Sequence, residues 1–255
     1  MEKLAIYGDS FAAINYSRLH EASTGLHWIN VLRLVWPQTS VYAEPATSLY
    51  WTYRNFVETH ARHDRVIVIA TAPLRVTIRN HLHQNIPISA SSINQVEWVL
   101  KNSSMDPNVR KAFGALKDYL IWVQDEQMDT DMNQWILDDI RRQRPDAIII
   151  PIGKPYGWGH EHASLKGLVS MSDIQRIAVA SLRPELLDQF DREGLNVEET
   201  GWVQAHMTPE VNTYFAQLVD DALEQGIWAP KLVEHVDHNL PWSHYYREEL
   251  VWLKS

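Results

Sequence analysis

Two short runs of aliphatic residues constrain the fold of this chain most strongly. They occupy residues 65–70 (Arg-Val-Ile-Val-Ile-Ala) and 146–152 (Asp-Ala-Ile-Ile-Ile-Pro-Ile), without the alternation of polar residues that marks a strand with one solvated face. Such runs are typical of strands buried on both faces, which occur in parallel sheets covered by helices. Because helical patterns separate the runs, the sequence predicts an α/β fold with a mainly parallel sheet covered by helices on both faces.

The other elements are predicted from periodicity and from residues that begin or end helices. Further strands are expected at 4–7, 40–44 and 194–198. Helices are expected within 11–35 and at 50–62, 108–125, 130–143, 172–189 and 209–225. Residues 74–107 remain unassigned, because Pro87 and Asp106-Pro107 are typical breakers of regular structure.

Two of these helices have apolar stripes that predict their buried faces. The stripe of the helix at 130–143 consists of Met132, Trp135, Ile136 and Ile140. The stripe of the helix at 209–225 consists of Val211, Phe215, Leu218, Val219 and Ala222.

One domain is expected over residues 1–226, with an extension over 227–255 that packs on this domain or on a partner. The 255-residue chain has 11 tryptophans, and the extension contains Trp228, Trp242 and Trp252. Large aromatic side chains fill cores and also anchor interfaces. These three are therefore candidates for a contact between copies of the chain, which predicts a homo-oligomer.

Composition argues against several classes of protein. The net charge of −9 disfavours nonspecific nucleic-acid binding, which uses a basic surface. The chain has no cysteine, which excludes disulfides and thiolate metal sites and is typical of a reducing compartment. No signal peptide or membrane span is recognised, so we expect a cytoplasmic protein without a membrane partner.

The stretch Gly8-Asp9-Ser10 ends the first predicted strand. Ligands of open α/β sheets bind beyond the carboxyl ends of the strands, which is where this stretch falls. A serine at the start of a following helix is able to attack a carbonyl while its own N–H binds the oxyanion that forms. The alternative interpretation is that Asp9 or Ser10 only caps that helix.

A histidine near the other end of the sequence strengthens the first interpretation. His206 precedes Thr208-Pro209-Glu210, a signature of a helix start, and follows the last predicted strand. It is thus expected at the same edge of the sheet as Ser10. A neutral imidazole in contact with the serine hydroxyl would act as its general base.

The segment Ile-Tyr-Gly-Asp-Ser-Phe-Ala (6–12), followed far downstream by His-Met-Thr-Pro-Glu-Val-Asn (206–212), resembles the blocks of the SGNH, or GDSL, hydrolases. This resemblance implies a three-layer α/β/α sandwich with a mainly parallel, flavodoxin-like sheet. It also implies a serine esterase with Ser10 as nucleophile and His206 as base. The stretch 46–56 also resembles a block of a divergent, phage-associated branch, which would place the protein in a host cytoplasm or a virion.

Carried over by position, the resemblance implies several donors to the oxyanion. Asp9 would hold the turn, and the N–H groups of Ser10 and Ala46 would bind the oxyanion. The Gly-x-Asn-Asp block of the family is replaced by Thr-Ala-Pro-Leu-Arg, so its asparagine is missing and Thr71 or Arg75 would substitute.

A further departure concerns the third member of the triad. Val203 stands where the family has an aspartate that orients the histidine. Glu198 or Glu199 would have to supply the carboxylate, or the site would work as a Ser-His dyad.

The loop at 151–167 follows a predicted strand and overhangs the same edge. Its Tyr156 and Trp158 would stack on a sugar or acyl group, or would instead pack the sheet edge. Histidine pairs occur at His81/His83, His160/His162 and His235/His238, but common metallohydrolase motifs are missing. We therefore expect no metal and no cofactor.

The sequence thus predicts an esterase that cleaves a small-molecule or carbohydrate ester, for example an O-acetyl group. A catalytically impaired binding or structural protein on the same fold is the main alternative. A third is another α/β enzyme in which Ser10 only caps a helix.

Overall fold

The computed structural model of the chain describes residues 2–14, 27–44, 47–71, 76–79, 85–88, 96–97, 100–101, 107–122, 125–153, 165, 168–171, 173–174, 176 and 209–229. Within these ranges four strands form a parallel sheet in the order β2-β1-β3-β6. Their bounds are Leu4–Gly8 for β1, Thr39–Ala43 for β2, Arg65–Ala70 for β3 and Ile148–Pro151 for β6. The order 2-1-3 of the first three strands is that of flavodoxin-like sheets.

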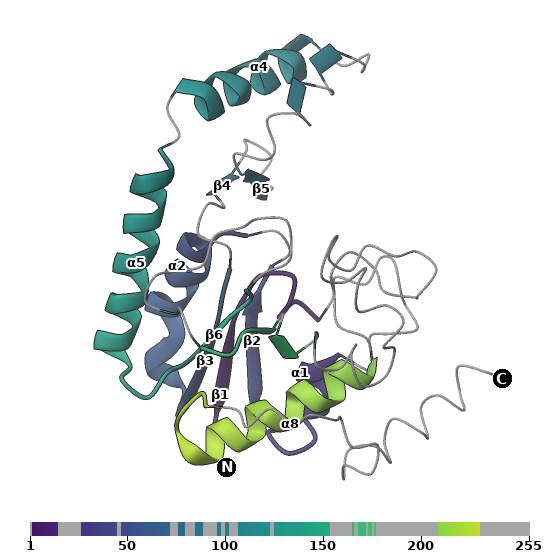
Figure 1. Cartoon of the computed structure of the whole chain (residues 1–255), viewed down its shortest axis with the longest axis vertical. Coiled ribbons are helices and arrows are strands. Elements are labelled where there is room, and N and C mark those ends of the chain that lie inside the picture. Colours follow the sequence, from purple (N-terminus) through teal and green to yellow (C-terminus); the bar gives the residue numbers. More distant parts are fainter. Residues whose placement is uncertain are drawn as a thin grey trace, which may run out of the picture.

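Helices cover both faces of this sheet (Figure 1). On one face lie α1 (Trp28–Leu32) and α8 (Pro209–Gln225), and on the other lie α2 (Leu49–Thr59) and α5 (Glu126–Gln143). A 3₁₀ turn, η2 (His60–Arg62), continues α2 towards β3. The three-layer α/β/α fold predicted from the sequence is confirmed.

Alternate residues of the strands supply the two halves of the core. Leu4 and Ile6 of β1 pack in the cluster formed with α1 and α8. Ala5 and Tyr7 pack in the cluster formed with α2 and α5. The Tyr7 hydroxyl lies 2.8 Å from Oγ1 of Thr59, and burial raises the pKa of Tyr7 to about 12.

The stretch left unassigned between 74 and 107 contains an antiparallel hairpin, β4 (Val76–Arg79) and β5 (Asn85–Ile88). Pro87 belongs to β5 and pairs with Thr77, so its interpretation as a breaker is wrong. Each strand of a two-stranded sheet has an open edge, where a missing N–H is tolerated. The helix α4 (Pro107–Trp122) follows and lies above the sheet in Figure 1.

The predicted buried face of α5 is partly wrong. Ile136 and Ile140 are buried as expected, but Met132 and Trp135 are 44% and 58% exposed. The buried turn of the helix instead carries polar groups with hydrogen-bond partners. Asn133 Nδ2 donates to the Asp129 carbonyl at 2.6 Å, and the Tyr53 hydroxyl donates to Asp139 at 2.7 Å. Hydrogen bonds from Tyr53 and Arg142 lower the pKa of Asp139, which keeps this buried carboxylate charged.

Trp228, the second residue of the predicted C-terminal extension, belongs to the core, whereas Ile227 before it is exposed. Trp228 is buried against Phe215 of α8, and its Nε1 donates to the Val169 carbonyl at 2.7 Å. Three predictions lie outside the described residues. They are the contact expected of Trp242 and Trp252, the strand at 194–198 and most of the helix at 172–189. Within the described ranges, no helix combines the length and apolar character that a membrane span needs.

Candidate active site

The order of the sheet locates the candidate site at the carboxyl ends of β1 and β3. The chain passes from β1 to β2 on one side and then to β3 on the other, so the strand order reverses at β1. Open α/β sheets bind ligands at such a reversal. Tyr7 pairs with Val68 near the ends of these strands, so Ser10, after β1, and Thr71, after β3, follow the same edge of the sheet.

Gly8 ends β1 at a point where the chain has no room for a side chain. A Cβ built on Gly8 would lie 3.0 Å from the Cβ of Ala12 and 3.0 Å from the Cβ of Ile69. Both of these Cβ atoms are bonded directly to the main chain, one in the following turn and one on β3, so they cannot swing aside. Glycine at this position therefore lets the turn that carries Ser10 fold back closely against the sheet.

We expect Gly8→Ala to lower the free energy of unfolding by about 1–3 kcal/mol, because the added methyl overpacks a filled site. Gly114→Ala is the matched control, since nothing lies within 4 Å of a Cβ at that position of α4. The control should raise stability by about 0.5–1 kcal/mol or leave it unchanged. Urea denaturation of both variants measures the difference, and equal effects would contradict the steric argument.

Asp9, and not Ser10, organises the turn after β1. Asp9 is fully buried, and its Oδ1 accepts a hydrogen bond from the Phe11 N–H at 3.1 Å. The Asp9 carbonyl accepts from Ala12 N–H at 3.0 Å. Asp side chains commonly close turns in this way. Within the described part of the chain, the hydroxyl of half-buried Ser10 makes no hydrogen bond, so it is not used as a cap.

The expectation that Ser10 begins a helix is wrong for the residues described. Residues 10–12 form a turn, and the next described helix, α1, begins at Trp28. The reason is local: Asp9 closes a tight turn by two bonds to its own neighbours. The dipole of a helix therefore does not act on Ser10, and a general base would have to activate its hydroxyl.

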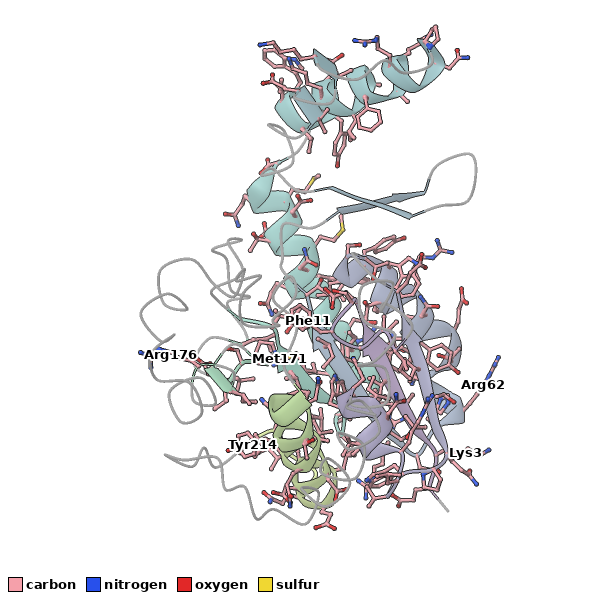
Figure 2. All side chains as sticks on the ribbon, turned by 90° about the vertical axis from the view of Figure 1, so that its right-hand side faces the viewer. Lys3, Phe11, Arg62, Met171, Arg176 and Tyr214 are labelled. Carbon is pink, nitrogen blue, oxygen red and sulfur yellow. The ribbon has the colours of Figure 1, made fainter. Side chains whose placement is uncertain are left out.

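Two hydrogen bonds connect this turn to the beginning of α8. Trp28 Nε1 donates to the Phe11 carbonyl at 2.7 Å, and the Trp28 main-chain N–H donates to Asn212 Oδ1 at 3.2 Å. The Trp28 ring also packs edge-on against Phe215, with the ring centroids 4.9 Å apart. The turn after β1 and the first part of α8 are thus held together. In Figure 2, Phe11 lies at the opposite end of the sheet from Lys3.

The connection between the turn after β1 and α8 is relevant to His206, which lies outside the described part of the chain. The helix α8 begins at Pro209, as the sequence predicts. His206 precedes Pro209 by three residues in the sequence. Asn212, three residues further on, bonds to the tryptophan that contacts Phe11, the neighbour of Ser10.

The remaining predicted residues have different outcomes. Thr71 directly follows β3 and is fully buried. The following predicted residues lie outside the described part of the chain: Ala46, Arg75, Tyr156, Trp158 and the histidine pairs at 81/83, 160/162 and 235/238. The loop of Tyr156 and Trp158 follows Gly153, whose φ of 79° turns the chain away at the end of β6. In the part of the chain that the structure describes, no three His, Cys, Asp or Glu side chains gather as a metal site would require.

Sequence analysis missed Trp28 and Asn212, the two residues that connect the turn to α8. They are separated by 184 positions, and no motif marks either of them. Only the proximity of α1 and α8 on one face of the sheet brings them together.

Compared with models of known protein families and with curated protein sequences, the chain shows no match.

Proposed function

We propose that the chain is a serine hydrolase of the SGNH type that cleaves a carboxylic ester. One observation carries the proposal: Ser10 lies at the strand-order reversal, with a hydroxyl that caps nothing described, in a turn bonded through Trp28 to the start of α8. The helix that His206 precedes is thereby held near the turn of Ser10. Serine and histidine at one sheet edge are the minimum that this chemistry needs.

In the proposed reaction, His206 accepts the proton of the Ser10 hydroxyl as Oγ attacks the ester carbonyl. The bond between the carbonyl carbon and the ester oxygen breaks, and the imidazolium returns the proton to the leaving alcohol. Water then hydrolyses the acyl-enzyme by the same steps. The N–H groups of Ser10 and Ala46, with Thr71 or Arg75, would stabilise the oxyanion.

The proposed substrate is a small-molecule or carbohydrate ester, such as an O-acetylated sugar. Tyr156 and Trp158 would stack on it from the loop that follows β6. We propose a cytoplasmic location, on the ground that the sequence has no cysteine.

A second candidate function is binding without catalysis. Val203, in place of an aspartate before His206, favours it, because a histidine without a carboxylate partner is a weaker base. The Thr-Ala-Pro-Leu-Arg stretch at 71–75, which lacks the asparagine donor of the SGNH pattern, also favours it.

A fluorophosphonate probe separates the two candidates, because it reacts covalently with an activated serine. We expect the intact chain to be labelled once and Ser10→Ala to be unlabelled, with peptide mass spectrometry placing the adduct on Ser10. Heat-unfolded protein is the control for nonspecific reaction. Equal absence of label from the folded chain and from Ser10→Ala would favour the binding protein.

A further inference from the structure

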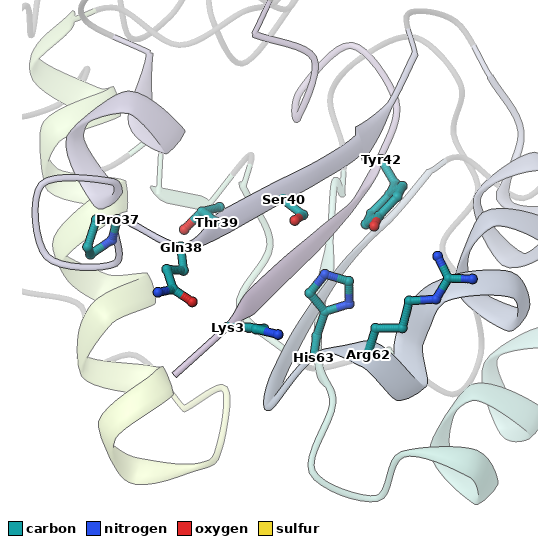
Figure 3. A pocket seen from close by; sticks show the side chains of 8 residues that line it. All are labelled: Lys3, Pro37, Gln38, Thr39, Ser40, Tyr42, Arg62 and His63. Atoms are coloured by element: carbon teal, nitrogen blue, oxygen red, sulfur yellow. The ribbon is translucent and has the colours of Figure 1, made fainter. Parts of the chain in front are cut away.

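A cavity of about 380 Å³ lies at the amino-terminal end of the sheet, where β1, β2 and β3 begin. Because Ser10 follows the carboxyl end of β1, this cavity is at the opposite end of the sheet from the candidate active site. Its lining residues, shown in Figure 3, are Lys3, Pro37, Gln38, Thr39, Ser40, Tyr42, Arg62 and His63. We call it the β2 cavity.

The lining of the β2 cavity is basic, although the whole chain carries a net charge of −9. Lys3, Arg62 and His63 contribute basic side chains, and no carboxylate lines the cavity. Among the ion pairs of the described residues, none involves Lys3 or Arg62. Lys3 and Arg62 line the cavity on either side of His63 (Figure 3), and both cations would attract an anion bound there.

Neighbouring groups hold two of the lining side chains in place. Tyr42 is stacked on Tyr7 with centroids 5.0 Å apart, and the His63 ring lies edge-on to Tyr42 at 5.7 Å. His63 Nδ1 lies 3.1 Å from the Thr59 carbonyl, which accepts its proton. Nε2 is then the ring nitrogen of His63 that remains for a ligand. The aromatic wall of the cavity is therefore preorganised.

The main-chain oxygens of the same segment are already occupied. Arg144 Nη1 donates to the carbonyls of His60 and His63 at 3.1 and 2.9 Å, and Nη2 donates to that of Asp64 at 2.9 Å. The Asp64 carboxylate accepts from the Lys3 main-chain N–H at 2.8 Å. These carbonyls and the Asp64 carboxylate thus have hydrogen-bond partners of their own, whereas neither the ammonium of Lys3 nor the guanidinium of Arg62 forms an ion pair within the described part of the chain.

We propose that the β2 cavity binds a small phosphate monoester, such as a sugar phosphate. A phosphate monoester carries nearly two negative charges and three acceptor oxygens. The cavity offers donors from three directions: Lys3 ahead of β1, Ser40 and Tyr42 on β2, and Arg62 after α2. Its volume lies in the range of small-molecule sites and leaves room for the organic part of the ligand. This inference does not depend on the proposed hydrolase function.

Calorimetric titration with ribose 5-phosphate tests the proposal, with ribose and inorganic phosphate as comparison ligands. We expect ribose 5-phosphate to bind, inorganic phosphate to bind more weakly and ribose not to bind. Each of Arg62→Gln and Lys3→Gln should weaken binding about tenfold, because each removes a charged hydrogen-bond donor. Arg54→Gln is the matched control, since Arg54 is an exposed residue of α2 that does not line the cavity.

Amide chemical shifts locate the binding site in the same samples. Ribose 5-phosphate should perturb the amides of Ser40, Tyr42 and His63, and Arg62→Gln should require about tenfold more ligand for the same perturbations. Three results would overturn the proposal: no binding at millimolar ligand, perturbations confined to the carboxyl end of the sheet, or equal weakening by Arg54→Gln and Arg62→Gln.

Discussion

Replacing His206 with glutamine should lower kcat/KM for a soluble ester such as p-nitrophenyl acetate by about 10⁴-fold. The expected size follows from hydrolases in which serine and histidine act as a unit, where loss of either residue removes most of the rate enhancement. Glutamine retains a polar side chain of similar length but cannot accept the proton of Ser10. The measurement is the steady-state rate after subtraction of the uncatalysed hydrolysis.

The double variant Ser10→Ala/His206→Gln is the internal control for this result. If the two side chains act together, the double variant should be no slower than Ser10→Ala alone, because the effects of such residues are not additive. A rate for His206→Gln within tenfold of the unchanged protein would contradict the role of His206 as base. Multiplicative losses in the double variant would show that the two residues act separately.

Replacing Trp28 with alanine should lower the free energy of unfolding by about 3–5 kcal/mol, the usual cost of truncating a buried tryptophan. Trp28 is fully buried, packs against Phe215 and donates its indole N–H to the Phe11 carbonyl. The substitution leaves a cavity between α1 and α8 and a carbonyl without its donor. Urea denaturation followed by circular dichroism measures the loss.

Trp122→Ala serves as the matched control, because Trp122 is 80% exposed on α4. A substitution at such a surface position should change stability by no more than about 0.5 kcal/mol. Trp28→Phe separates packing from hydrogen bonding, since it keeps a ring but removes the donor to Phe11. If Trp28→Ala costs no more than Trp122→Ala, the turn after β1 is not anchored through Trp28.

The fold was predictable where one local signal was enough. The continuous aliphatic runs at 65–70 and 146–152 became β3 and β6 within one or two residues, since only a doubly covered strand accommodates them. The Thr-Pro-Glu signature likewise placed the start of α8 at Pro209. Prediction was wrong for Met132 and Trp135, because apolar spacing does not show that Asp129 and Asn133 are buried instead, with Asn133 Nδ2 bonded to the Asp129 carbonyl.

The candidate site, like the fold, was predictable from the sequence only in part. Gly8-Asp9-Ser10 at the end of a strand is visible in the sequence, because the strand and its turn residues are contiguous. The turn that forms there in place of a helix depends on the Asp9 carboxylate reaching the Phe11 N–H. The sequence equally places His206 ahead of a helix, but it does not show which part of the sheet that helix contacts.

The sequence by itself determined the class of the fold and the strands of its core, and it supplied the short motifs on which the proposed serine hydrolase rests. These follow from hydrophobic patterns and short motifs, which act over a few neighbouring residues. Tertiary structure alone decided that Asn212 meets Trp28, that Trp28 meets Phe11, and that Lys3 and Arg62 line one cavity. These contacts join segments far apart in the chain, and their partners are selected only when helices and strands pack around a common core.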